Sequence, residues 1–293
     1  MMKIFNKNNI FKFLIFSFFS LVTLLIFYIS KKIYISSHGY IFKNELRLAL
    51  TTFKLMFVII IPVFFLTMFI IYYYRRSNIS SSYKPNWNHS YFLEIVCWLI
   101  PFIIIFFLAN LSYKTTHNLD PSKSLKLNTN KPITIEVISL NWRWLFIYPD
   151  YKIATINEIA FPKHVPIHFN ITSHSVMNSF FIPSLGSQIY TMAGMKTNLN
   201  LIAMNSGIYK GISSNYSGHG FSDMKFRVCV HNNIFDFSKW IKKIKLKKNV
   251  LFSKKQFLKL SYNSKQNHIQ YFSYVDPLLF YKIIDMFNIL HNV

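Results

Sequence analysis

Hydrophobic residues are distributed in two different ways along the chain. Before residue 111 they form three long runs, 10–29, 55–74 and 91–111, each close to the roughly 20 residues that an α-helix needs to cross a bilayer. From about Lys131 they occur instead in short segments of alternating or continuous apolar character, separated by turns and prolines. The pattern predicts two or three membrane helices followed by an all-β domain.

Five segments after residue 131 have the length and pattern of strands: 132–139, 142–148, 166–172, 197–203 and 224–230. Several short strands within about 100 residues predict a β-sandwich or barrel. Farther on, the pattern predicts a basic helix at 239–248, a strand at 268–275 and a short helix from Pro277. We therefore divide the chain into an N-terminal hydrophobic segment (1–38), a transmembrane helix hairpin (39–112), a linker (113–130), an exported β-domain (131–231) and a C-terminal extension (232–293).

Basic residues between the second and third apolar runs predict the orientation in the membrane. Arg75, Arg76 and Lys84 lie in this loop, which the positive-inside rule places in the cytoplasm. Residues from Ser112 onward would then lie on the opposite side. The basic residues before residue 55 oppose this assignment, since they lie on the other side of the second run.

The first apolar run is either a signal peptide or a retained helix. Lysines precede it, as in both classes of segment, but no small-x-small cleavage site follows near Ser30. We favour a retained helix. No cysteine follows the run, so the sequence offers no site for a lipid anchor.

The net charge of +23 is compatible with a nucleic-acid partner, but the distribution of lysines is not. They are spread throughout a chain rich in Asn, Ile and Phe, as an AT-rich genome would produce. In the basic helix, Phe237, Trp240, Ile241 and Ile244 share one face. We expect this helix to dock on its own domain rather than on a membrane surface, and no nucleic-acid partner.

The stretch SSNYSGHGFSDM, 213–224, has a glycine-rich turn, a histidine and a methionine, but neither cysteine nor glutamate. Soft thiolates are the ligands that hold copper in electron-transfer sites, and a serine hydroxyl does not ionise to replace them. Cys229 and His231 do not complete a blue-copper site, because no suitable methionine follows. Cys229 should also face away from Met224, Phe226 and Val228 by strand alternation. A disulfide between Cys97 and Cys229 is not expected, since Cys97 lies inside an apolar run.

The loop nevertheless resembles the motif C-x-E-x-C-G-x-x-H-x-x-M of subunit II of haem–copper respiratory oxidases. Matching stretches include YKPNWNHS (83–90), KPITIEVISLNWRWLFIYP (131–149), SVMNSFFIPSLGSQIYTMAGM (175–195) and YSGHGFSDMKF (216–226). The resemblance is to the copper-free branch, subunit II of cytochrome bo-type ubiquinol oxidases. It implies a membrane helical hairpin, an exported cupredoxin-like β-sandwich and an aromatic-rich α/β extension.

The resemblance also assigns the positions at which copper-bearing relatives have their ligands. Of the motif, only the methionine and the turn glycine are kept. We therefore regard the ligand positions as vacated and expect no metal at them: Asn178, Ser213, Asn215, Ser217, Phe221 and Met224. Trp142 and Trp144 match tryptophans that relay electrons from copper in those relatives. Without copper, we expect them to serve packing. His168 and His174 have no partner at metal spacing, and we expect hydrogen-bonded histidines of the surface or of loops rather than metal ligands.

The function implied by the resemblance is that of a non-catalytic subunit of a proton-pumping ubiquinol oxidase in a bacterial inner membrane. No cofactor is expected in this chain. Haem and copper would reside in partner subunit I, which would also bind ubiquinol, and cytochrome c would not be a partner. The exported domain would be periplasmic. The alternatives are a cytochrome c oxidase subunit II, which lacks its thiolates here, and a membrane-tethered copper-binding protein, for which MAGM (192–195) is the only support.

Glu94 is the only acid between Glu45 and Asp120 and lies about one turn into the third apolar run. An acid at membrane depth is a functional candidate, but a carboxylate near a helix N-terminus is also stabilised by the helix dipole. The residues alone do not separate these readings. The resemblance implies proton entry, because a glutamate of subunit II at this place lies at the mouth of a proton channel into subunit I.

Overall fold

The computed structural model of the chain describes residues 20, 28, 31, 37–76, 78, 86–123, 125, 131–251, 254–262 and 268–291. The chain divides into two compact units, one of residues 44–123 and one that combines residues 1–43 with residues 124–293. The first apolar run, for which we favoured a retained helix, lies outside the described residues except for Ser20 and Tyr28. Lys84 of the basic loop is also outside them.

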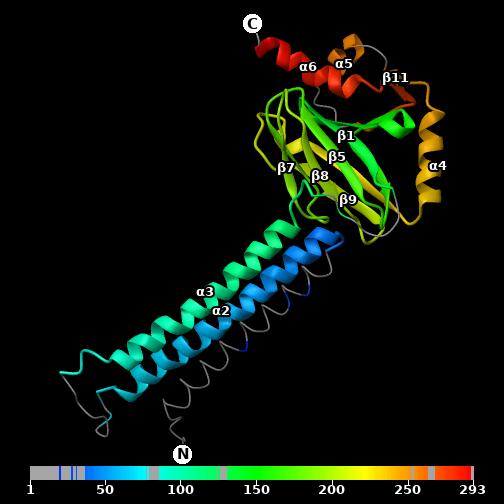
Figure 1. Cartoon of the computed structure of the whole chain (residues 1–293). Helices are drawn as coiled ribbons and strands as arrows, with labels where there is room; N and C mark the ends of the chain where they lie inside the picture. The colour runs from blue at the N-terminus through cyan, green and yellow to red at the C-terminus, as the bar shows by residue number, and fades with distance from the viewer. Residues whose placement is uncertain are drawn as a thin grey trace, which may run out of the picture. The chain divides into compact units, whose positions relative to one another are not determined.

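Two long apolar helices, α2 (Tyr40–Tyr73) and α3 (Tyr91–Asn118), account for the first unit (Figure 1). Both are long and apolar enough to cross a membrane, as predicted. Most of their large apolar side chains are exposed, as a surface that faces lipid requires. The helix α2 begins at Tyr40 rather than near Leu55, because its first turns mix good helix formers with polar residues that a search for apolar runs passes over.

The second unit is a sandwich of two β-sheets (Figure 1). One sheet has the strand order β12-β3-β2-β1-β5-β8 and the other β4-β10-β9-β6-β7. The strands are β1 (Ile133–Leu140), β2 (Arg143–Tyr148), β3 (Ile153–Ile156), β4 (Glu158–Pro162), β5 (Ile167–Ser173), β6 (Asn178–Phe181), β7 (Gln188–Thr191), β8 (Thr197–Leu201), β9 (Gly207–Ser213), β10 (Lys225–His231) and β12 (Gln270–Phe272). A separate pair joins β11 (Val250–Leu251) and β13 (Tyr274–Val275).

Aromatic side chains from both sheets fill the space between them. The rings of Phe180 and Phe226 stack with centroids 5.2 Å apart, and Trp144 meets Phe180 edge-on at 5.4 Å. Alternation places these side chains inside: in β10, Phe226 and its alternate neighbours are buried while Arg227 is exposed. Trp144 is completely buried, so the predicted packing role of this tryptophan is confirmed.

The C-terminal extension covers the outer face of the six-stranded sheet with a second core. Ile138 and Leu145 pack in one buried cluster with Phe257, Phe280 and Ile283, which come from α5 (Lys254–Ser261) and α6 (Leu279–His291). Strands of this sheet are therefore buried on both faces. This explains why β2 reads as a continuous apolar run rather than as an alternating one.

The basic helix α4 (Ile234–Lys245) docks on the sandwich, as predicted. Phe237, Ile241 and Ile244 are buried in the core between the sheets, and Trp240 packs against it. The lysines of α4 lie on its exposed side.

Residues up to Lys43, which include the first turn of α2, belong to the sandwich unit. Gly39 forms an isolated bridge with Ala203 on β8's continuation, and Ile41 is buried in the core. A Cβ atom at Gly39 would lie 2.1 Å from the carbonyl oxygen of Leu185, a distance that no side chain tolerates. This close approach ties the start of α2 to the domain by backbone contact.

The five predicted strands are present, but the pattern missed β3, β4, β6, β7, β9 and the short β11. Three of these have only four residues, too few for a period of two to be recognised. The strand β9 contains Gly207 and Gly211, residues that favour turns when only the sequence is considered.

Candidate functional site

The loop that resembles a copper-binding motif connects two neighbouring strands of the five-stranded sheet. It leaves β9 at Ser213, passes through a short 3-10 helix, η2 (Phe221–Asp223), and enters β10 at Lys225. The amide of Ser213 donates to the carbonyl of Met224 at 3.2 Å, which closes the loop at its base. The two ends of the motif are therefore held together by backbone hydrogen bonding between the strands.

The indole of Trp142 supports the middle of this loop. Its Nε1 donates to the carbonyl of Ser217 at 3.4 Å. A Cβ atom at Gly220 would lie 2.3 Å from the indole ring, and Gly218 has a φ of +107°. Gly218 is needed for the left-handed backbone and Gly220 for the close approach of the indole, and the packing role predicted for Trp142 is confirmed.

Two of the vacated ligand positions lie in direct contact. Ser213 Oγ donates to Asn178 Oδ1 at 3.1 Å, and both residues are almost completely buried. Asn178 Nδ2 donates in turn to the carbonyl of Val176 at 3.1 Å, which fixes the amide with its oxygen towards the serine. The structure thus brings together the end of β9 and the start of β6, as a shared site requires.

The other vacated positions make different contacts. Asn215 Nδ2 donates to the carbonyl of Met177 at 3.2 Å, and the ring of Phe221 packs against Tyr216 with centroids 5.7 Å apart. Met224 is buried in the core. Ser217 Oγ is buried and has no hydrogen-bond partner among the described residues. The Met224 amide donates to the carbonyl of Phe221 at 3.1 Å, and among the described residues no side-chain hydrogen bond joins these four residues to one another.

These donors do not fit copper. The side chains offered are two hydroxyls, two amides, a phenyl ring and a buried thioether, none of which replaces a bridging thiolate. Among the described residues, no group of three or more His, Cys, Asp or Glu side chains is placed to hold a metal ion. The hydrogen bond from Ser213 to Asn178 also uses the groups that would have to turn towards a metal.

Cys229 and His231 lie towards the end of β10, the strand that the loop enters at Lys225, and both side chains are outside the core between the sheets. Cys229 is half-buried, in contrast with Val228 and Val230, as alternation predicted. Burial raises the pKa of the Cys229 thiol, and burial lowers the pKa of the His231 imidazole. A protonated thiol is a poor copper ligand.

Of the two histidines expected to be hydrogen-bonded, one is. His168 Nδ1 lies 2.8 Å from Asn200 Oδ1. The prediction is wrong for His174, whose Nδ1 is buried without a partner among the described residues. Its ring instead packs on Phe257 at 4.9 Å, and this burial lowers the pKa of His174. Phe257 lies in the C-terminal extension, and its contact with His174 could not be predicted from the residues around His174.

Glu94 lies in the first turn of α3, where its amide donates to the carbonyl of Ser90 at 3.0 Å. The carboxylate is exposed, and its Oε2 lies 3.8 Å from His89 Nδ1. A histidine and a carboxylate thus stand together at the N-terminal end of a membrane helix. This pair was not recognised from the sequence, although His89 and Glu94 are only one turn apart.

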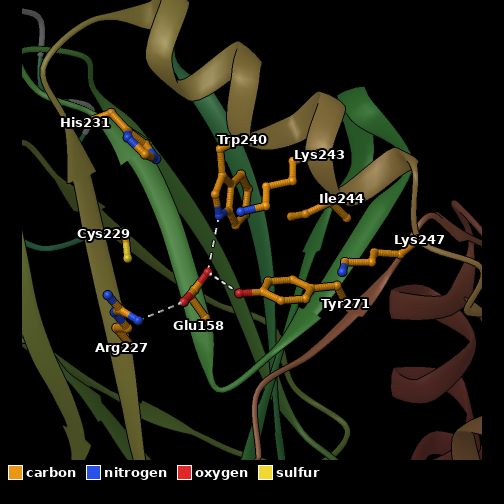
Figure 2. Close-up of a pocket in the computed structure, with 9 residues that line it drawn as sticks. All are labelled: Glu158, Arg227, Cys229, His231, Trp240, Lys243, Ile244, Lys247 and Tyr271. Carbon is orange, nitrogen blue, oxygen red and sulfur yellow. Dashed lines mark hydrogen bonds and ion pairs between the residues drawn. The ribbon is translucent and has the colours of Figure 1, made fainter.

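A pocket of about 350 Å³ on the sandwich unit was also missed (Figure 2). Its buried carboxylate, Glu158, accepts hydrogen bonds from Tyr271 Oη at 2.8 Å and Trp240 Nε1 at 3.2 Å, and lies 3.8 Å from an Arg227 nitrogen. Its residues come from β4, β10, α4, β12 and the segment that follows α4. No local sequence signal connects segments so far apart.

Comparison with known proteins identifies both parts of the exported unit. Residues 152–230 match the family described as cytochrome c oxidase subunit II, periplasmic domain, and residues 251–289 match the COX aromatic rich motif. The sandwich is therefore cupredoxin-like, with the aromatic-rich extension that was expected.

Whole-chain relatives were found as well. The chain is 53% identical to cytochrome bo(3) ubiquinol oxidase subunit 2 of Buchnera aphidicola subsp. Baizongia pistaciae, over 84% of this chain and 86% of that protein. It is 50% identical to the protein of the same name from Buchnera aphidicola subsp. Schizaphis graminum, over 96% of this chain and 95% of that protein. The protein of the same name from Pseudomonas aeruginosa is 47% identical, over 84% of this chain and 73% of that protein.

Proposed function

The chain belongs to the family of cytochrome bo(3) ubiquinol oxidase subunit 2, and on this basis we propose that it supports quinol oxidation without a copper centre of its own. Haem, copper and ubiquinol would be bound by the partner subunit I. The helices α2 and α3 would brace that subunit within the bilayer. The cupredoxin-like domain would cover its periplasmic side.

The observation that carries the proposal is the hydrogen bond between Ser213 and Asn178 at two former ligand positions. Where copper-bearing relatives need a thiolate and an imidazole, this chain has a hydroxyl bonded to an amide. A quinol delivers electrons from within the membrane, so a metal relay on the exported domain has no electrons to carry. The loop keeps its shape because Trp142, Gly218 and Gly220 hold its backbone.

Electron entry from cytochrome c is the main alternative, and the charge of the chain opposes it. The chain has ten acids, and the eight that follow residue 111 are outnumbered by the lysines and arginines around them. A basic cytochrome docks on an acidic surface, which this domain does not offer.

The second part of the proposal concerns proton supply. Glu94 would collect protons from the cytoplasm and pass them to subunit I. Its exposure at the end of α3 and the proximity of His89 support this role, since a group that takes protons from water must be reachable. The membrane orientation proposed with it places the segment before α3 in the cytoplasm and the sandwich in the periplasm.

Purification of the complex through a tag on this chain tests the proposal. A much larger polytopic partner and haem should copurify with the chain. The complex should reduce oxygen with ubiquinol and should not oxidise reduced cytochrome c. Oxidation of cytochrome c at a rate comparable to that of quinol would contradict the assignment.

A further inference from the structure

The pocket beside α4 has the dimensions and the lining of a small-molecule site. Its volume of about 350 Å³ falls in the range of ligand pockets, which are typically about 300–1,000 Å³. One wall is apolar, formed by Trp240, Ile244 and Tyr271 (Figure 2). Flat aromatic surfaces of this kind bind an apolar body by area and stacking.

The charges around the pocket are unequal. Arg227, Lys243 and Lys247 line it together with a single acid, Glu158. The carboxylate of Glu158 is 4% exposed and is already engaged by Tyr271, Trp240 and Arg227. The charge of Arg227 therefore offsets that of Glu158, and the positive charges of Lys243 and Lys247 remain.

These two lysines have no acidic partner in the part of the chain that the structure describes. No ion pair there involves Lys243 or Lys247. Lys243 lies in the last turn of α4, and Lys247 follows the helix, held by a hydrogen bond from its amide to the carbonyl of Ile244 at 2.9 Å. Figure 2 shows the Lys243 ammonium next to the Trp240 ring and the Lys247 ammonium next to Tyr271.

A further polar group lines the same space. His231 Nε2 is buried and has no hydrogen-bond partner among the described residues. Burial lowers the pKa of this imidazole, so the ring is neutral at pH 7 and can donate or accept one hydrogen bond. A buried polar atom without a partner is rare in native proteins, and a bound ligand would supply the partner.

We propose that this pocket binds a small organic anion, a single carboxylate or phosphate group attached to a flat apolar body. The anionic group lies between Lys243 and Lys247, and the apolar body lies against Trp240 and Tyr271. Neither the proposed oxidase role nor the vacated copper positions enters this inference. The pocket lies along β10 from Arg227 to His231, whereas the loop 213–224 enters the start of that strand at Lys225.

Calorimetric titration of the full-length chain in detergent tests the proposal with 2-naphthoate as the probe. Its heat is compared with that of an injection into detergent alone, because the probe also partitions into micelles. We expect a dissociation constant of about 1 mM, because a probe of this size gains roughly 0.3 kcal/mol per non-hydrogen atom. The neutral analogue 2-naphthamide should bind at least about tenfold more weakly, and inorganic phosphate, which lacks the apolar body, should give no measurable binding.

A matched pair of variants identifies the site. The double variant Lys243→Gln/Lys247→Gln should weaken 2-naphthoate binding by about tenfold, the effect of two partly exposed charge contacts. The double variant Lys242→Gln/Lys245→Gln removes the same charge from the neighbouring residues of the same segment, which do not line the pocket, and should bind as the wild type does. Equal affinity in all three proteins, equal binding of the neutral analogue, or no binding at millimolar concentration would each overturn the proposal.

Discussion

Ser213 and Asn178 are joined by a buried hydrogen bond of 3.1 Å between positions 35 residues apart in the chain. The bond links the last residue of β9 to the first residue of β6, at the end of the sheet from which the loop 213–224 projects. Both residues occupy places where copper-bearing relatives are expected to have ligands. The polar contact thus links the two segments directly.

Glu94→Ala should slow oxygen reduction by the assembled complex severalfold while leaving haem content and subunit composition unchanged. The reason is that the variant removes the titrating group at the proposed proton entrance. Glu94→Asp keeps a carboxylate and should retain much of the activity. Steady-state oxygen consumption with ubiquinol, together with proton uptake by the complex, measures the effect.

Asp120→Asn is the control for this series. Asp120 is an exposed acid just beyond the other end of α3, bonded to Ser122, and its loss should leave turnover unchanged. A Glu94→Ala complex that consumes oxygen and takes up protons at the wild-type rate would show that this carboxylate has only a surface role at the helix terminus.

The orientation in the membrane is tested by labelling single cysteines in a Cys97→Ser/Cys229→Ser background. Asn88→Cys, just before α3, should react with a membrane-impermeant maleimide only in inverted vesicles. Lys248→Cys, in the sandwich unit, should react only from the periplasmic side. Both positions are exposed, so access to the label depends on the side of the membrane. The opposite pattern would contradict the orientation and, with it, proton entry at Glu94.

Glu136 is predicted to make the sandwich less stable as the pH rises. It is 3% exposed, and its Oε2 has no hydrogen-bond partner among the described residues. Burial raises its pKa from 4.5 to about 7, against a smaller lowering by Lys196. Because the folded state holds this proton more tightly, the group's contribution to the free energy of unfolding is complete below about pH 4.5 and is lost as the pH rises through about 7.

The variant Glu136→Gln should remove this pH dependence. At pH 8 it should raise the free energy of unfolding by on the order of 2 kcal/mol, whereas near pH 4 it should have little effect. Denaturant unfolding of the full-length chain in detergent, followed by tryptophan fluorescence, measures the difference. Asp150→Asn, at an exposed acid of the same unit, is the control. A variant as pH-dependent as the wild type would rule out Glu136 as the source.

The sequence predicted those parts of the molecule that depend on local pattern. The apolar runs located α2 and α3, and alternation located β10 and the orientation of Cys229. The docking face of α4 followed from the spacing of Phe237, Ile241 and Ile244. Each of these depends on residues that are close together in the chain.

Features that depend on distant segments were not predicted. The unpartnered Nδ1 of His174 results from packing by Phe257, which lies in the extension. The pocket around Glu158 requires Trp240 and Tyr271 to meet a strand far earlier in the chain. Such contacts form between segments that are far apart in the chain, so the spacing of residues within one segment does not predict them.

Copper binding by the full-length chain, purified without its partner subunits, tests the central claim most directly. The Cys97→Ser/Cys229→Ser background is incubated with copper, desalted and analysed for metal and for visible absorption. A variant of this background that also carries Asn178→His, Ser213→Cys, Ser217→Cys and Phe221→His is the positive control, since it restores thiolate and imidazole ligands. We predict well below one copper per chain and no thiolate-to-copper absorption before this restoration, and both signals after it. A pair of copper ions bound stoichiometrically at the native residues of the loop would contradict the account and return cytochrome c as the electron donor.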